Sequence, residues 1–319
     1  MNKPLFAAVV LPALVLMASC EPNKGNEVTE PEQPAFSVDT TARKGIGVFS
    51  VAAGKTVTFS PGNLQYTTIG SHLAADGSTQ KGTWRFAEQQ YDVIGAYNML
   101  SSADYEGWID LFGWGTSGFD NLKNDSGALY FQPWDTIDAP FGRGYGPSPE
   151  KTDRELTDIY RYYDWGIYNA ISNGGNVPGL WRSLTDKEWE YLTHDRENAH
   201  LLCSSATVNN MKGHILLPDD FMMPSDIQWT PVAQNDTTNV YTVEQWNRLQ
   251  DAGAVFLPAA GRRVGSTVYG VGILCTGYYW TGSPVENQAV YYLFSYEGAM
   301  NWSKNWRQIG CSVRLVQDL

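Results

Sequence analysis

The sequence predicts an α+β fold in which short strands outnumber helices. Runs rich in β-branched and aromatic residues occur early, between residues 47 and 86, and again over the last third of the chain. Two short segments after the first of these regions carry the N-terminal capping signals of helices. No repeat with a period of about 20–50 residues is visible in the sequence. The strands and helices are therefore expected to build one large domain or two small ones.

The first folded element is expected to be a β-hairpin. Residues 45–66 read GIGVFSVAAGKTVTFSPGNLQY, in which AAGK separates two β-rich runs and PGN marks a turn. Another strand is predicted over residues 83–86. Residues 101–119 interleave aromatic side chains with glycine, which indicates packed irregular structure. Residues 116–165 contain several prolines and are expected to be rich in loops.

Two capping boxes predict the helices. Thr185 and Glu188 have the Ser/Thr-x-x-Glu spacing, and Thr242 and Gln245 have the same spacing with glutamine. Gly253 follows the second helix and is suited to the left-handed position beyond a helix C-terminus.

Strands are predicted around and after these helices. Residues 206–221 indicate two strands that meet at Lys212–Gly213. Residues 289–296, AVYYLFSY, are largely apolar on both faces, which is typical of a buried central strand. Residues 311–316, CSVRLV, are predicted to form the closing strand. On that strand Arg314 points opposite to its apolar neighbours and is expected to be structural.

The N-terminus has the composition of a secretory signal. Residues 5–18 read LFAAVVLPALVLMA, which is short for a membrane span, contains a proline and is preceded by a single charge at Lys3. The sequence MASC that ends at Cys20 resembles a bacterial lipobox with Met in place of the usual Leu. We therefore expect a lipoprotein signal peptide over residues 1–19 and a lipid anchor on Cys20. An ordinary signal peptide with a chance cysteine is the alternative.

The region after the signal separates into a tether and a folded part. Residues 20–43 are polar, acidic and proline-containing, which is typical of a flexible tether. Residues 44–319 hold the predicted domain, with the β-hairpin as its N-terminal extension. The whole chain has a net charge of −12, which argues against nucleic acid as a partner. The expected location is the outer membrane at the cell surface, with the periplasmic face as the alternative.

Phrases along the folded part resemble a known family. GLWRSLTDKEWEYL, AVFLPAAGRR, GYYWTGSP, AVYYLFSY and GCSVRLV occur in this order in the second half. They resemble the major paralogous domain first described from Fibrobacter succinogenes, which is abundant in lipoproteins of Bacteroides and its relatives. VAAGKTVTFSPGNLQY, WIDLFGWGTSG, WGIYNAISNGG and ILLPDDF look like the same Bacteroidales proteins. The resemblance implies a C-type lectin-like fold, with two small sheets, two flanking helices and the last strands in the central sheet.

That fold is related to the formylglycine-generating enzymes, but the resemblance does not imply their chemistry here. Those enzymes use paired cysteines and a metal, and Cys275 and Cys311 lack the surrounding sequence expected for such a pair. No GxSxG, HExxH or phosphate-binding glycine loop is present. Asp219 and Asp220 could form a pair of catalytic carboxylates, but a solvent-exposed turn after Pro218 is the favoured interpretation. We therefore expect that the protein is not an enzyme and that it binds neither a cofactor nor a metal.

The cysteines leave two alternatives open. Apart from Cys20 the chain contains Cys203, Cys275 and Cys311, and an odd number leaves at least one thiol unpaired. Cys275 and Cys311 both lie in apolar runs, where they either form a disulfide or remain buried thiols.

The strongest candidate for function is a ligand-binding surface near the C-terminus. Residues 297–310, EGAMNWSKNWRQIG, are predicted to form an exposed turn with the composition of a paratope, combining rigid indoles with adaptable polar side chains. A protein or a glycan is the expected ligand. The alternatives are an aromatic edge of the core, a structural subunit of a fimbria-like surface assembly, and a receptor diversified by a retroelement. The candidate ligand-binding residues are Trp280, Ser283, Glu286, Asn287, Tyr296, Asn301, Trp302, Ser303, Asn305 and Trp306.

Overall fold

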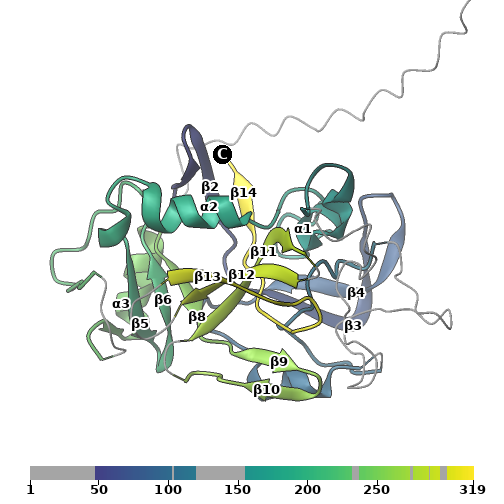
Figure 1. Cartoon of the computed structure of the whole chain (residues 1–319). Coiled ribbons are helices and arrows are strands. Elements are labelled where there is room, and N and C mark those ends of the chain that lie inside the picture. Colours follow the sequence, from purple (N-terminus) through teal and green to yellow (C-terminus); the bar gives the residue numbers. More distant parts are fainter. Residues whose placement is uncertain are drawn as a thin grey trace, which may run out of the picture. The chain divides into compact units, whose positions relative to one another are not determined.

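Several small sheets, joined by short helices and loops, build the folded part of the protein (Figure 1). The structure is a computed structural model, and it describes residues 47–102, 104–119, 155–231, 237–273, 276–286, 288–294 and 300–319. The described residues belong to one folded unit. The predicted signal peptide, the tether and Cys20 lie outside the described residues, as do Cys275, Asn287 and Tyr296.

The predicted α+β class is confirmed, because the sheets are mostly antiparallel and the helices are few and short. The N-terminal hairpin is present as β1 (Phe49–Ala52) and β2 (Lys55–Phe59). Strand β2 also pairs with the last strand, β14 (Val316–Asp318). The other sheets are β3 (Leu64–Leu73) with β4 (Thr79–Phe86); β7 (Val240–Tyr241), β5 (Cys203–Val208), β6 (Met211–Leu216) and β8 (Val255–Pro258) in that order; β9 (Arg262–Val264) with β10 (Thr267–Tyr269); and β11 (Gly277–Val285), β12 (Gln288–Phe294) and β13 (Met300–Trp306) in that order.

Both predicted capping boxes are present. The Thr185 hydroxyl accepts a hydrogen bond from the Glu188 N–H, and the Glu188 carboxylate accepts one from the Thr185 N–H, so two orphan donors at the helix start are satisfied. Thr242 and Gln245 make the same exchange, and Gly253 has a φ of 98° just beyond that helix.

The described helices are all short. The α-helices are α1 (Trp165–Tyr168), α2 (Asp186–Glu190) and α3 (Val243–Asp251). The 3-10 helices are η1 (Gly95–Leu100), η4 (Asp158–Tyr163) and η6 (Ala199–Leu201). Residues Tyr191–Asp195 form η5, a π-helical turn that continues α2.

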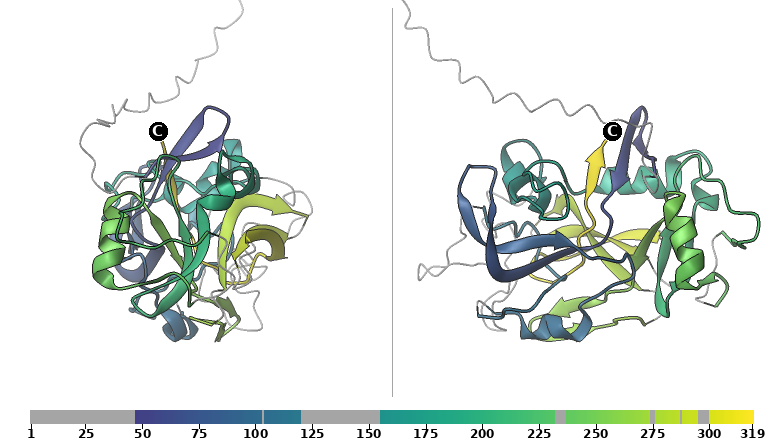
Figure 2. Two further views of the ribbon diagram at one scale, coloured as in Figure 1. Left: turned by 90° about the vertical axis from the view of Figure 1, so that its left-hand side faces the viewer. Right: turned by 180° about the vertical axis from the view of Figure 1, so that it is seen from behind.

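Helix α3 lies along the sheet that contains β5, β6 and β8 (Figures 1 and 2). Its Trp246 and Leu249 are fully buried in one cluster with Ile215 and Phe256 from that sheet. Burying one apolar stripe of a short helix in this way supplies stability that the isolated helix would lack.

The turn between β5 and β6 differs from the predicted position. The two strands meet at Asn209–Asn210, with φ of 48° and 65°, rather than at Lys212–Gly213. Asparagine tolerates the left-handed region better than other residues with a Cβ, so an Asn-Asn pair can form a two-residue hairpin turn.

The closing strand also lies later in the chain than predicted, since β14 spans Val316–Asp318 rather than residues 311–316. Regular pairing begins only at Val316, whereas Cys311 and Ser312 make isolated bridges to Phe112 and Tyr279. Arg314 is buried, and its guanidinium donates to the side chains of Asn63 and Gln90. Its role within the described residues is therefore structural.

Strand β12 is the predicted buried central strand. On one face Tyr291 packs edge-on against Trp280, and on the other Tyr292 stacks on Trp189 of α2 with ring centroids 4.9 Å apart. The neighbouring strand on one side is β11 and on the other side β13. Because β12 is held on both faces, the backbone of β13 is paired to a rigid support.

Buried His214 on β6 leads to a pH-dependent prediction. Desolvation lowers the pKa of His214 to about 3, and its Nε2 has no hydrogen-bond partner in the described part of the chain. An unfolded histidine has a pKa of about 6.5, so the stability due to neutral His214 is fully present above that pH and is lost as the pH falls toward 3. The loss from this residue should reach about 2 kcal/mol at pH 5.

This prediction is tested by urea unfolding of the wild type and His214→Leu at pH 7, 6 and 5. The wild type should lose more stability over this range than the variant, by the amount assigned to His214. Parallel pH profiles in the two proteins would contradict the assignment.

Candidate ligand-binding surface

The segment predicted as an exposed turn is in part a strand. Met300–Trp306 form β13 and pair with β12 over its whole length. The prediction of a loop was therefore wrong for this part. Trp302, Lys304 and Trp306 alternate with smaller polar residues, which is the two-residue period of a strand. This strand forms its main-chain hydrogen bonds with the apolar strand β12.

The two indoles stand in solvent on one face of β13. Trp302 is 60% exposed and Trp306 is 48% exposed, and Lys304 between them is also exposed. Directly opposite on β12 are Tyr292 for Trp302 and Gln288 for Trp306. Residues two apart on a strand share a face, so the three side chains form a Trp-Lys-Trp row about 13 Å long. We call Trp302, Lys304 and Trp306 the β13 row.

The other face of β13 carries Ser303 and Asn305, which are half-buried. Burial raises the pKa of Tyr291, and a hydrogen bond with the Ser303 side chain opposes that shift. The Asn305 side chain accepts a hydrogen bond from the Trp306 N–H at 2.9 Å. Both side chains therefore help to fix the strand, and the two indoles remain the larger accessible groups.

Two predicted ligand-binding residues are not at the surface, which corrects the sequence analysis. Trp280 is 2% exposed, and its Nε1 donates to the Phe112 carbonyl at 2.6 Å. Ser283 is 3% exposed and its hydroxyl bonds to the Asp186 carboxylate at 2.9 Å. Both side chains are held in the interior by these contacts, so neither can contact a ligand directly.

The structure describes the four remaining predicted ligand-binding residues only in part. Glu286 is exposed at the β11–β12 turn, where its φ is 50°. Asn287 and Tyr296 lie outside the described residues, and Asn301 is described only through its backbone pairing with Leu293.

A buried arginine that the sequence analysis did not single out holds the end of β13. The Arg307 guanidinium donates to the carbonyls of Gln288 and Glu286 at 3.0 and 2.9 Å and lies 4.6 Å from the Trp114 ring. The Trp114 N–H in turn donates to the Arg307 carbonyl at 2.7 Å. These contacts fix the chain directly after Trp306. No local signal separates such an arginine from an exposed one, since its partners are distant main-chain carbonyls.

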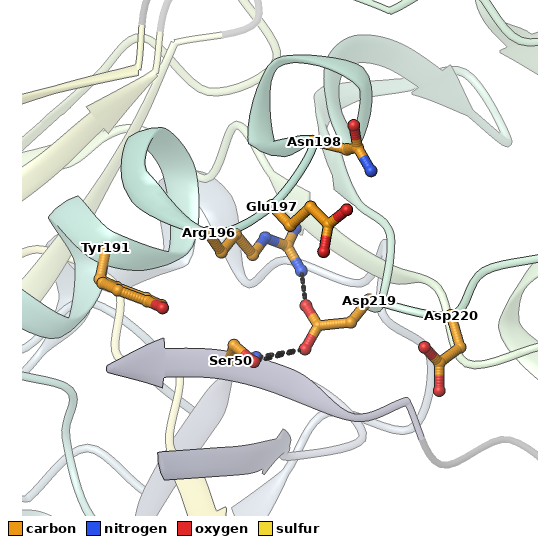
Figure 3. A pocket seen from close by; sticks show the side chains of 7 residues that line it. All are labelled: Ser50, Tyr191, Arg196, Glu197, Asn198, Asp219 and Asp220. Carbon is orange, nitrogen blue, oxygen red and sulfur yellow. Dashed lines mark hydrogen bonds and ion pairs between the residues drawn. The ribbon is translucent and has the colours of Figure 1, made fainter. Parts of the chain in front are cut away.

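A polar cavity of about 460 Å³ lies elsewhere, between β1, η5 and the turn after β6 (Figure 3). Asp219 accepts hydrogen bonds from the Ser50 N–H and hydroxyl and forms an ion pair with buried Arg196 at 2.8 Å. Asp220 also lines the cavity. The Asp219 carboxylate is thus engaged in structural contacts, whereas Asp220 is exposed in the turn.

Metal-ligating side chains do not cluster in the described ranges. No group of three or more His, Cys, Asp and Glu side chains there is arranged to hold a metal ion. Cys203 and Cys311 are buried free thiols, and burial raises the pKa of each, so neither is a ready nucleophile. The described residues also contain no helix long and apolar enough to cross a bilayer.

Comparison with known proteins gives no match. No family model, no curated protein and no solved structure matches this chain. The geometry of the candidate surface is therefore the basis for assigning a function.

Proposed function

We propose that this protein is a non-catalytic binding protein that holds a protein or glycan ligand through the β13 row. The observation that carries the proposal is the exposure of two tryptophans on one strand. Tryptophan is usually largely buried. Trp302 and Trp306 instead place large apolar rings in water at 60% and 48% exposure.

Rigid support makes these rings suited to binding. The strand is paired with β12, which is packed on both faces, and Arg307 fixes the residue after Trp306. A ligand that covers the indoles therefore orders little protein on binding, which lowers the entropy cost of association. Tryptophan is also among the residues that contribute most at binding hot spots.

The proposed fold and location follow from the resemblance. We place the chain among the C-type lectin-like lipoproteins of the major paralogous domain family, held at the outer membrane by a lipid on Cys20. The several small antiparallel sheets and the two capped helices are compatible with the α+β class to which this fold belongs. Tethering to the cell surface would present the β13 row to extracellular ligands.

A structural subunit of a cell-surface assembly is the second candidate function. It is favoured by the position of β13 at the edge of its sheet among the described residues, since an edge strand can pair with a strand of another protein. In that case the same row would meet a neighbouring subunit.

The test compares binding by the wild type and by Trp302→Ala/Trp306→Ala. Glycan arrays and a panel of extracellular proteins supply the ligands, and the retained ligand is titrated by calorimetry. The double variant should bind at least about tenfold more weakly, since one lost anchor commonly costs more than 1 kcal/mol.

The matched control is Tyr97→Ala/Tyr269→Ala. It removes two aromatic side chains that are 68% and 51% exposed on η1 and β10, outside the β13 row. The control should retain wild-type affinity. Equal affinity of the tryptophan variant and the wild type for every retained ligand would refute the proposal.

A further inference from the structure

The main chain of β11 determines which groups of β12 face β13. The Trp280 N–H donates to the Ser312 carbonyl at 3.0 Å, and the Ser312 N–H donates to the Tyr278 carbonyl at 2.9 Å. Tyr278 and Trp280 therefore direct main-chain groups away from β12, and Tyr279 between them directs its groups toward its partner Tyr292.

The alternation continues across the sheet. Because Tyr292 directs its main-chain groups toward β11, its neighbour Tyr291 directs them toward β13. The partner of Tyr291 is Ser303, so Ser303 bonds back to β12. Trp302 and Lys304 flank Ser303, and their N–H and C=O groups consequently point away from β12. On that side β13 pairs with no other strand of the described residues, and we call it the open edge.

An independent observation at the end of β13 agrees with this register. The Trp306 N–H donates to the Asn305 side chain at 2.9 Å, and the Trp306 carbonyl accepts from the Ile309 N–H at 3.0 Å. Trp306 is two residues from Lys304 and four from Trp302, so its main-chain groups point to the same side of the strand as theirs. Its N–H and C=O groups also bond to atoms outside β12. The open edge therefore ends at Trp306, where internal bonds close it.

Trp302 and Lys304 thus present two donors and two acceptors in an alternating row. In the described part of the chain, no hydrogen bond to these outward main-chain groups is found. Residues two apart on a strand are separated by about 7 Å, which matches the repeat of another strand. An extended polypeptide can satisfy all four groups in register, whereas a sugar offers no such repeat.

We propose that the open edge of β13 binds an extended segment of a partner protein by strand addition. The segment pairs with the main chain of Trp302 and Lys304, and its apolar side chains cover the indoles. Exposed Lys304 makes no ion pair with the described residues, so the fitting segment carries a carboxylate opposite it. This inference rests on the proposed function and names protein as its ligand class.

The probe is a phage-displayed library of linear nine-residue peptides, selected against the full-length protein. The best peptide is synthesised with capped ends and titrated by calorimetry. Amide hydrogen exchange is measured by NMR with and without it. The amides of Trp302 and Lys304 should exchange at least about tenfold more slowly when the peptide is bound, because they gain hydrogen-bond partners.

Lys304→Pro is the decisive variant. It removes an outward N–H that the sheet does not use, and proline is tolerated on edge strands at such positions. The variant should fold but bind the peptide at least about tenfold more weakly, whereas Lys304→Ala, which keeps the N–H, should lose less. Ser303→Pro is the matched control for register, because it removes an inward N–H and should lower the melting temperature further than Lys304→Pro.

Each other outcome overturns the inference. Unchanged affinity of Lys304→Pro, failure of the library to yield a binding peptide, or peptide protection confined to other amides would exclude strand addition. Protection of Trp302 and Lys304 without peptide, together with dimerisation, would assign the edge to a second copy of this chain. If Lys304→Pro binds normally while Trp302→Ala/Trp306→Ala does not, strand addition fails and the proposed function stands. If instead Trp302→Ala/Trp306→Ala binds normally while Lys304→Pro does not, strand addition stands and the proposed role of the indoles in binding fails.

Discussion

Trp189→Ala is expected to lower the free energy of unfolding by about 3–5 kcal/mol, the usual cost of truncating a buried aromatic residue to alanine. Trp189 is 1% exposed on α2 and stacks on Tyr292 with an angle of 14° between the rings. It also lies 5.8 Å from Phe59 of β2. Its removal would open a cavity between the helix, the N-terminal hairpin and the central strand. Equilibrium urea unfolding measures the change.

Two variants serve as controls for this prediction. Trp189→Phe should cost less, because it keeps an aromatic ring and removes an indole N–H that has no partner in the described residues. Trp302→Ala should change stability by no more than about 0.5 kcal/mol, because its ring is in solvent. A loss of several kcal/mol in Trp302→Ala would show that this indole supports the fold.

Asp219→Ala is expected to cost about 3–5 kcal/mol, because it leaves a buried positive charge without its partner. The Arg196 side chain is 1% exposed, and its Nη1 lies 2.8 Å from the Asp219 carboxylate. The remaining hydrogen bond from Arg196, to the Leu217 carbonyl, supplies no negative charge. Ser50 on β1 would lose two hydrogen bonds at the same time, so the N-terminal hairpin would be loosened from the turn after β6.

Asp220→Ala is the matched control, one residue away. Its carboxylate lines the cavity in Figure 3 without an interaction drawn to another lining residue. The change should stay within about 0.5 kcal/mol of the wild type by urea unfolding. Equal losses in the two variants would mean that both aspartates belong to one unit, contrary to their different contacts.

Local signals account for the parts of the fold that sequence analysis predicted. The capping boxes at Thr185 and Thr242 lie within four residues of their partners, so the sequence contains the whole interaction. The N-terminal hairpin and the central strand β12 follow from patterns of similar length. The closing strand was predicted too early in the chain because residues 311–315 are buried and bridge to distant segments at isolated positions, without forming a regular ladder.

The candidate site was predictable only in part. The composition of residues 301–306 indicated an accessible aromatic segment, and Trp302 and Trp306 are exposed. Trp280 is also an indole in an aromatic stretch, yet it is buried, because exposure depends on which strands cover each face. The register that turns the main chain of Lys304 outward depends on a bond between β11 and Ser312. Such nonlocal pairing has no signature in a single sequence.

Fluorine NMR on the 5-fluorotryptophan-labelled protein can show directly whether Trp302 and Trp306 contact the ligand. The chain contains twelve tryptophans, and Trp302→Phe and Trp306→Phe assign the two signals of interest. A soluble paramagnetic reagent should broaden these two signals strongly, and adding the ligand retained in the binding screen should shift them and restore their width. If both signals stay unchanged at saturating ligand while signals of other tryptophans move, the β13 row is not the binding surface.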